Sequence, residues 1–190
     1  TEGTRTSLDY DTRDFFWEEG DRIYAKDDGN VFQHSSNAVT GTRQAAFKFL
    51  MPGTYAHSSY FVYYPGKNGT ENNVTIASAQ TQNGPDNTLH FGISGDCGTG
   101  TVTRQPNGQY KFRLNHAAAY LCFKPTYSHP LASTYVTKIE VTANKNIAGA
   151  YALGTDGRLT GTGSSRTITL TPKTAGSSDG FAMQNNAAGT

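Results

Sequence analysis

The sequence lacks several features that mark common classes of binding and membrane proteins. Its 190 residues carry 16 basic and 15 acidic side chains with no Lys- or Arg-rich block. This balance argues against nucleic acid as the main partner, because phosphate binding needs clustered positive charge. No apolar run approaches the roughly 20 residues that a membrane-spanning helix needs. The two cysteines match no zinc pattern, since a structural zinc site takes four ligands in close pairs.

Leucine is also scarce, with nine residues against 26 threonines, and only 16% of the residues are charged. Helices favour Leu, Ala, Glu and Lys, whereas Thr, Tyr, Phe and Val fit a half-buried pleated surface. With 12% aromatic residues, the composition is far from that of a disordered chain. The length suits one large domain or at most two small ones, and the composition predicts an all-β fold.

Alternation with a period of two residues recurs along the chain. In 110–114, aromatic and aliphatic side chains alternate with Lys and Arg, which predicts a strand with one solvated face. The segments 138–142 and 166–171 follow the same pattern. Two denser runs, Tyr60–Tyr64 and Ala118–Phe123, predict central strands that are covered on both faces.

Turn signals separate these runs at short intervals. Three dipeptides are typical of tight hairpins, namely Asp28-Gly29, Asn107-Gly108 and Asp156-Gly157. About ten strands follow from this spacing, which is expected of a sandwich or barrel. The segment from Ala79 to Phe91 shows no clear period, and we expect an ordered loop there. Because the run after Ala175 is small and polar, we expect one β-sandwich over 1–175 and a linker, or the start of a further lobe, over 176–190.

Groupings that could support catalysis are weak. The five histidines are scattered, and no two share a metal-ligand spacing on one element. His116 could approach Cys97 or Cys122 in space and form a Cys–His nucleophile. Burial preferences favour the simpler interpretation of a core thiol and a hydrogen-bonded histidine. For Cys97 and Cys122, a disulfide and two buried thiols both remain open. We therefore predict a protein that is not an enzyme and that binds no metal or cofactor.

Carboxylates are concentrated near the start of the chain. Their spacing matches no calcium loop, and solvated turns and strand ends account for them more simply. A glycosidase needs two carboxylates at the right separation in space, and the sequence selects no such pair. The residues concerned are Asp9, Asp11, Asp14, Glu18, Glu19, Asp21, Asp27 and Asp28.

Two groups of aromatic residues stand out, Phe15-Phe16-Trp17 and the rings of 60–64. Exposed rings such as Trp17, Tyr63 and Tyr64 would form a platform on which sugar rings stack. The alternative is that these rings fill the core of the sandwich, since each buries a large apolar area. The core interpretation is favoured, because alternate members of each run must face opposite sides of a strand.

Several segments, taken in order and with their spacing, resemble the fimbrillin family, the type V pilins and related surface proteins of anaerobic gut and oral bacteria. The similarity extends over nearly the whole chain. The segments are Arg5-Thr-Ser-Leu8, Phe16-Trp-Glu-Glu-Gly-Asp-Arg-Ile-Tyr24, Tyr63-Tyr-Pro-Gly66, Gly95-Asp-Cys-Gly-Thr-Gly100, Leu114-Asn-His-Ala-Ala-Ala-Tyr-Leu-Cys-Phe123, Lys138-Ile-Glu-Val-Thr142 and Asn146-Ile-Ala-Gly149.

The resemblance implies a transthyretin-like, Greek-key β-sandwich of mostly antiparallel strands. It also implies export as a lipoprotein through the periplasm and outer membrane, and assembly at the cell surface. Family members polymerise after a protease removes an N-terminal segment and a strand from the next subunit fills the groove. Such strand donation is β-augmentation, in which backbone hydrogen bonds give affinity and alternate side chains occupy pockets. Arg5 is our candidate cleavage position, and Arg13 is a poorer one.

The expected function is therefore that of a structural subunit of a fimbria. Its expected partners are other copies of the chain, accessory tip or anchor pilins, and a host or bacterial surface ligand. The alternative is a carbohydrate-binding adhesin, or a tip or anchor protein that does not polymerise. No lipid-bearing Cys lies near Thr1, so membrane attachment is expected only through a lipid anchor on a precursor. The chain ends soon after Phe181-Ala-Met183, so a C-terminal lobe is either missing or shortened.

Overall fold

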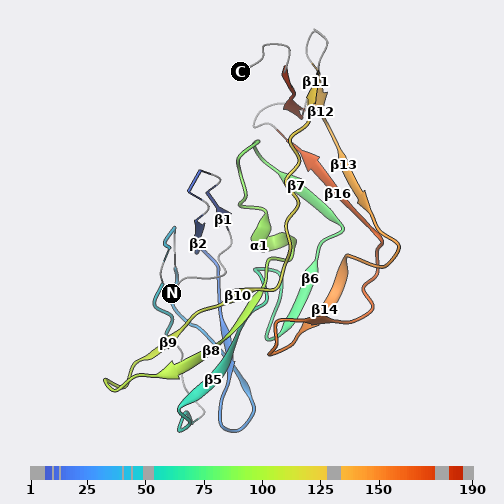
Figure 1. Ribbon diagram of the computed structural model, residues 1–190. Helices are drawn as coiled ribbons and strands as arrows, with labels where there is room; N and C mark the ends of the chain where they lie inside the picture. The colour runs from blue at the N-terminus through green and yellow to red at the C-terminus, as the bar shows by residue number, and fades with distance from the viewer. Residues whose placement is uncertain are drawn as a thin grey trace.

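The computed structural model shows an almost entirely β molecule with mostly antiparallel strands, which confirms the predicted fold class (Figure 1). Within the described residues, the single helical turn is α1 (Phe91–Ser94). The described part of the chain contains no helix that is long and apolar enough to cross a membrane. The structure describes residues 7–9, 11–12, 14–39, 41–43, 45–48, 54–127, 134–173 and 180–185.

The principal sheet has six antiparallel strands in the order β10-β8-β5-β3-β4, with β9 also paired to β8. At its centre, β5 and β8 pair in register from Ser59 opposite Thr103 to Tyr64 opposite Gly98. The predicted central strand at Tyr60–Tyr64 is therefore confirmed. The six strands are β3 (Tyr24–Lys26), β4 (Phe32–His34), β5 (Ser59–Tyr64), β8 (Gly98–Arg104), β9 (Tyr110–Phe112) and β10 (Asn115–His116).

Smaller sheets make up the rest of the molecule. One three-stranded sheet has the order β13-β16-β7, in which β16 and β7 run parallel, and another has the order β15-β14-β6. Three further pairs are β1–β2, β12–β17 and the parallel pair β11–β18. The bounds are β1 (Ser7–Leu8), β2 (Phe15–Phe16), β6 (Asn73–Ile76), β7 (Ala79–Gln82), β11 (Thr126–Tyr127), β12 (Tyr135–Val136), β13 (Ile139–Thr142), β14 (Gly149–Leu153), β15 (Leu159–Thr160), β16 (Thr167–Pro172), β17 (Phe181–Ala182) and β18 (Gln184–Asn185).

All three predicted turn dipeptides lie in hairpins, between β3 and β4, β8 and β9, and β14 and β15. Gly108 and Gly157 adopt positive φ angles of 80° and 79°, which suits glycine because it has no Cβ. In the first hairpin the positive φ falls on Asn30, at 62°, rather than on Gly29. The dipeptides thus predicted the positions of the hairpins correctly.

Two predictions about local structure were wrong. The segment from Ala79 to Phe91, expected to be a loop, begins with β7 and ends at the start of α1. Ala118–Phe123, expected to be a covered central strand, is not a strand, and Leu121 and Phe123 in it are 68% and 48% exposed. In both cases the outcome depends on whether a distant strand pairs with the segment, and local periodicity does not carry that information.

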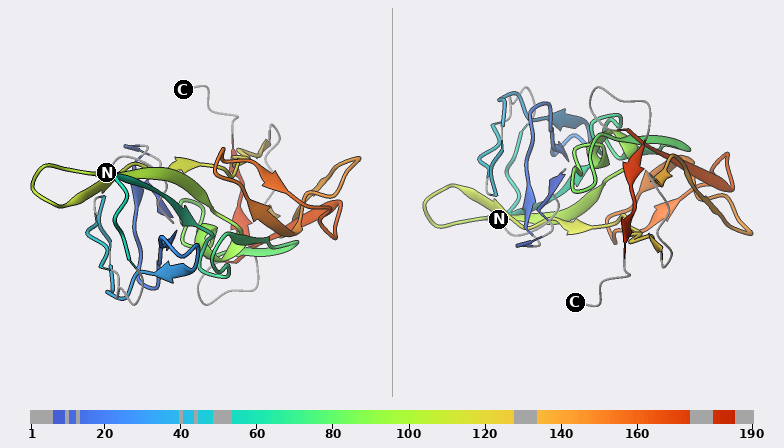
Figure 2. Two further views of the ribbon diagram at one scale, coloured as in Figure 1. Left: turned by 90° about the horizontal axis from the view of Figure 1, so that it is seen from below. Right: turned by 90° about the horizontal axis from the view of Figure 1, so that it is seen from above.

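Two hydrophobic cores flank the principal sheet. The strand β5 contributes to both, because its alternate side chains face opposite sides. Val62 and Tyr64 enter the first core, while Tyr63 packs with Val74 and Leu153 in the second. The second core joins the principal sheet to the sheet β15-β14-β6, so these two sheets form a β-sandwich. Figure 2 shows the corresponding arrangement, with the green central strands lying between the blue N-terminal strands and the orange C-terminal strands.

Candidate functional site

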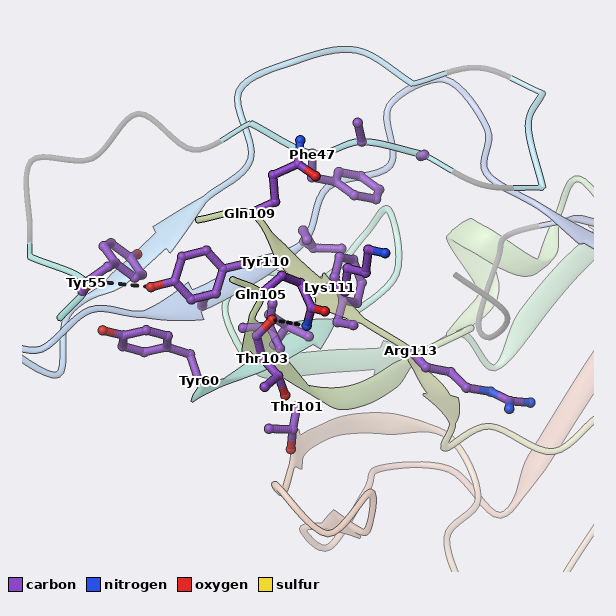
Figure 3. Close-up of a pocket in the computed structure, with 17 residues that line it drawn as sticks. Phe47, Tyr55, Tyr60, Thr101, Thr103, Gln105, Gln109, Tyr110, Lys111 and Arg113 are labelled. Atoms are coloured by element: carbon purple, nitrogen blue, oxygen red, sulfur yellow. Dashed lines mark hydrogen bonds between the residues drawn. The ribbon is translucent and has the colours of Figure 1, made fainter. Parts of the chain in front are cut away.

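A groove lies on the face of the principal sheet opposite the sandwich core (Figure 3). Its floor is formed by β5, β8 and β9, and the described residues 45–48 and 54–57 pass over it without forming a strand. The groove has a volume of about 1230 Å³. One face of the sheet is thus covered by another sheet, while the other carries the first hydrophobic core, which Trp17 and irregular chain cover beside the groove.

Strand register places the floor residues in a row. Val102 on β8 lies opposite Tyr60 on β5 and opposite Phe112 on β9, so these three side chains share the groove face. The next pair on the same face of β5 and β8 is Val62 with Gly100, and the glycine contributes no side chain. The floor is therefore apolar and aromatic, and the backbone of Arg113 fills the space beside Gly100.

Three tyrosines form one end of the groove. The ring centroid of Tyr60 lies 5.0 Å from that of Tyr55 and 6.1 Å from that of Tyr110. The Tyr110 hydroxyl donates a hydrogen bond of 3.3 Å to the carbonyl of Tyr55. At the covering segment, Phe47 contacts Trp17 edge-on at a centroid distance of 4.8 Å. These ring contacts hold the covering segment over the sheet at both ends of the groove.

Asp28 anchors the tyrosine end electrostatically. Its carboxylate accepts a 2.6 Å hydrogen bond from the Tyr60 hydroxyl and a 2.8 Å bond from the backbone N–H of Ala56. The bond from Tyr60 is the main reason that the pKa of Asp28 is lowered. Burial, with Asp28 as a second cause, raises the pKa of Tyr60 to about 12, and burial raises the pKa of Tyr55 to about 12. At neutral pH the rings are therefore uncharged, and the groove wall is apolar.

The β8–β9 hairpin gives the groove a polar rim. Gln105, Gln109 and Lys111 line it, and the last two are exposed. Gln105 donates a 3.2 Å hydrogen bond to the carbonyl of Thr103. An apolar floor with amide and ammonium groups along one rim suits an extended chain, which presents apolar and polar side chains alternately.

The three rings proposed from the sequence as a glycan platform lie in the core. Trp17, Tyr63 and Tyr64 are only 1%, 6% and 0% exposed. They pack against other rings, with Trp17 edge-on to Tyr64 at 5.4 Å. The candidate aromatic surface therefore moves to Tyr55 and Tyr110, which line the groove and are half-buried, while Tyr60 between them is only 8% exposed.

The two cysteines are both free thiols, Cys97 buried and Cys122 exposed, so the disulfide that remained open is not formed in the structure. Burial raises the pKa of Cys97 to about 12, so this thiol is protonated at neutral pH. His116 lies 3.3 Å from the carboxylate of Asp96, and within the described residues no hydrogen bond joins it to either sulfur. The structure does not assemble a Cys–His nucleophile.

Several N-terminal carboxylates lie in turns, but Asp21 and Asp27 are only 1% and 8% exposed, so the prediction of solvated turns and strand ends is wrong for these two. Asp9 accepts hydrogen bonds from the backbone N–H groups of Asp11 and Thr12. The carboxylate of Asp14 forms an ion pair with the guanidinium group of Arg43, with a nitrogen–oxygen distance of 2.8 Å. Among the described residues, no group of three or more His, Cys, Asp or Glu side chains could hold a metal ion.

Two further predictions fall on residues outside the described part of the chain. These are the cleavage positions Arg5 and Arg13, and the domain edge near Ala175. Beyond that edge, β17 pairs with β12 and β18 with β11. The described end of the chain is thus paired with strands of the C-terminal half.

Sequence reasoning identified only part of the groove. The alternation at 110–114 predicted that Tyr110 and Phe112 share a face, and the structure confirms it. Phe47 and Tyr55 lie in irregular chain, where no periodic signal could have marked them.

Comparisons with protein-family models, with curated proteins and with solved structures found no match to the chain.

Proposed function

We propose that the protein is a structural subunit of a cell-surface fimbria, and that a strand from a neighbouring copy occupies the groove on the principal sheet. Copies of this chain, together with tip and anchor subunits, are the partners. The resemblance of its motifs to the fimbrillin family supports this proposal, as does the all-β architecture. Proteolytic processing near Arg5 is the proposed trigger.

The observation that carries the proposal is the unequal covering of the principal sheet. One face packs against a second sheet, while the other holds a groove of about 1230 Å³ with an apolar floor. A donated strand would place alternate side chains against Tyr60, Val102 and Phe112.

Polymerisation of the full-length precursor tests the proposal. The precursor is incubated with an arginine-specific protease, and the products are boiled in detergent and separated by electrophoresis. We expect a ladder of oligomers, because a strand bonded along its length dissociates very slowly. Ala45→Trp places an indole in the groove wall, because Ala45 is half-buried and packs against the first core, and it should abolish the ladder.

The matched control is Ala150→Trp, at an exposed position on β14 away from the groove. This variant should polymerise like the unaltered protein. A complete absence of ladders, or ladders that are unaffected by Ala45→Trp, would show that the groove does not accept a strand.

The composition of the groove favours one second candidate, a carbohydrate-binding adhesin. Three tyrosines and the amide groups of Gln105 and Gln109 line the same site, and such residues suit sugar rings and hydroxyls. On a glycan array, Tyr110→Ala should then lose binding. Tyr135→Ala, which removes a tyrosine that is 42% exposed on β12, should retain it. Equal binding to every glycan, or to none, would remove this candidate.

A further inference from the structure

A second cavity, of about 470 Å³, shares no lining residue with the groove on the principal sheet. One wall is the sheet β13-β16-β7, which contributes Val141, Ile168 and Leu170. The helical turn α1 and the segment 117–123, which makes no strand, line the cavity as well. Its volume falls within the range of roughly 300–1,000 Å³ that is usual for small-molecule sites.

Most of the cavity wall is apolar. The rings of Phe91 and Tyr120 stack at a centroid distance of 4.4 Å and an interplanar angle of 23°, and both line the cavity. The three small alanine side chains at 117–119 leave space beside them. Leu121 and Phe123 at the rim are 68% and 48% exposed, so the cavity can be entered from the solvent.

Two polar side chains meet at one place on this wall, Ser94 on α1 and Gln80 on β7. Both residues are bonded to Ala77, whose backbone N–H donates a 3.1 Å hydrogen bond to the carbonyl of Ser94 and whose carbonyl accepts a 3.1 Å bond from the amide nitrogen of Gln80. Ser94 is only 8% exposed, and its hydroxyl forms no hydrogen bond within the described residues. The amide oxygen of Gln80 likewise accepts no bond there. One group that can donate and one that can only accept are therefore both unpartnered at this place.

The cavity offers no accessible charge to a ligand. Of the described residues that line it, none is Lys, Arg or Glu. The side chain of Asp96 is 0% exposed and its Oδ1 atom accepts the Tyr120 hydroxyl, so a molecule in the cavity cannot reach this carboxylate. His90 is 8% exposed, and burial lowers its pKa, so its ring is uncharged at neutral pH. A charged head group would therefore lose its hydration here without gaining an opposite charge.

We propose that this cavity binds a small neutral alcohol, with its hydroxyl group between Ser94 and Gln80 and its apolar body between the Phe91–Tyr120 pair and the sheet β13-β16-β7. The ligand hydroxyl donates a hydrogen bond to the amide oxygen of Gln80 and accepts one from the hydroxyl of Ser94. Both protein groups thereby gain a hydrogen-bond partner. The site does not depend on polymerisation, because it shares no lining residue with the groove on the principal sheet.

Four ligands with one body and different heads test the proposal on the unaltered protein. They are 3-phenylpropanol, its methyl ether, 3-phenylpropylamine and 3-phenylpropanoate, titrated into ¹⁵N-labelled protein and followed by amide chemical shifts. We expect the alcohol to bind about fivefold more tightly than the ether, which accepts a hydrogen bond but donates none, and about tenfold more tightly than either charged ligand. The shifts should lie at residues 76–82, 91–96 and 117–123. Binding by none of the ligands, an alcohol that binds no more tightly than the other three, or shifts confined to the principal-sheet groove would overturn the proposal.

Two substitutions separate the two hydrogen bonds. Gln80→Leu removes the acceptor, so the alcohol should then bind only as tightly as the ether. Ser94→Ala removes the donor, so the alcohol and the ether should both bind about fivefold more weakly and keep their order. The matched control is Thr81→Val, at the exposed neighbour of Gln80 that faces the other side of β7, which should change no affinity.

Ser94→Ala keeps the test decisive if Gln80→Leu does not fold, because it removes only one oxygen atom from α1. A folded Gln80→Leu protein that still prefers the alcohol to the ether would contradict the proposal. So would a Ser94→Ala protein that binds both ligands as tightly as the unaltered protein does.

Discussion

Asp28 shows how a single side chain joins three parts of the chain. It lies in the β3–β4 turn, and its carboxylate accepts one hydrogen bond from the Tyr60 hydroxyl on β5 and another from the backbone N–H of Ala56 in the covering segment. The backbone N–H of Asp28 also donates to the carbonyl of Thr54. One carboxylate therefore positions both the floor and the cover of the groove.

Acidification should weaken this anchor. Because the pKa of Asp28 in the folded protein lies below its ordinary value of 3.8, the ionised carboxylate stabilises the fold above that pH. This contribution disappears as the pH falls through the lower, folded-state pKa. The difference in unfolding free energy between the unaltered protein and Asp28→Asn should therefore shrink between about pH 5 and pH 2, as measured by urea denaturation.

Tyr60→Phe serves as the control for this experiment, because it removes the hydrogen bond that contributes most to the lowered pKa of Asp28. The variant should show a weaker pH dependence than the unaltered protein. A stability difference for Asp28→Asn that stays constant over the whole range would contradict the assignment.

Gly100 is required by a close approach of two backbones. A Cβ atom at this position would fall on the carbonyl oxygen of Arg113, which is backbone and cannot rotate away. Gly100→Ala should therefore lower the free energy of unfolding by about 1–3 kcal/mol, as overpacked positions do. The control is Thr101→Ala, at the exposed next residue of β8, which should change it by less than about 0.5 kcal/mol. Equal effects in urea denaturation would contradict this interpretation of the glycine.

At the scale of elements, the sequence predicted local pairings well and distant ones poorly. The hairpins at Asp28-Gly29, Asn107-Gly108 and Asp156-Gly157 are determined by turn residues within the segment itself. The strand β7 has no local signal, because its partner β16 lies about 90 residues later in the chain. The segment 118–123 has the composition of a covered strand, but no strand pairs with it.

The sequence also predicted only those parts of the candidate groove that depend on local pattern. The face shared by Tyr110 and Phe112 follows from alternation along one strand. The aromatic runs at Trp17 and Tyr60–Tyr64 were identified as prominent, but their burial depends on which residues oppose them. The Tyr55 ring reaches the groove through an irregular segment that Asp28 holds in place, and no pattern along the sequence encodes that bond.

The unpaired segment should be visible in hydrogen exchange. Residues 118–124 make no backbone hydrogen bond within the described part of the chain, whereas β5 and β8 are paired along their length. Amides of 118–124 should exchange at least about 100-fold faster than those of β5 at the same pH, as measured by mass spectrometry. Comparable protection in the two regions would mean that the segment is paired in solution.

At the scale of the whole molecule, the two hydrophobic cores share the strand β5. Tyr64 is fully buried in the first core, and the adjacent Tyr63 lies in the second with Leu153. A change in one core is therefore transmitted through the backbone of a strand that both cores require. We therefore expect the two hydrophobic cores to unfold in one cooperative transition.

The single tryptophan provides the measurement. Trp17 lies in the first core and Leu153 in the second. Leu153→Ala should lower the free energy of unfolding by about 2–5 kcal/mol, because the side chain is fully buried. If the molecule is one cooperative unit, the denaturation curve followed by Trp17 fluorescence shifts by the same amount as that followed by circular dichroism.

The control is Leu121→Ala, at a leucine that is 68% exposed, which should leave both curves within about 0.5 kcal/mol of the unaltered protein. A Trp17 transition that does not respond to Leu153→Ala would show that the two cores unfold independently.

The parallel pairing of β7 with β16 also affects the nascent chain during synthesis. A ribosome that adds about 5–20 residues per second needs roughly 5 to 20 s to synthesise the 90 or so residues between the two strands. Throughout that time the backbone N–H and C=O groups of β7 that bond to β16 in the fold are unpaired, and they can pair with β7 of another nascent chain. A holding chaperone that shields extended segments during synthesis should therefore raise the yield of this protein more than that of a chain built from hairpins alone.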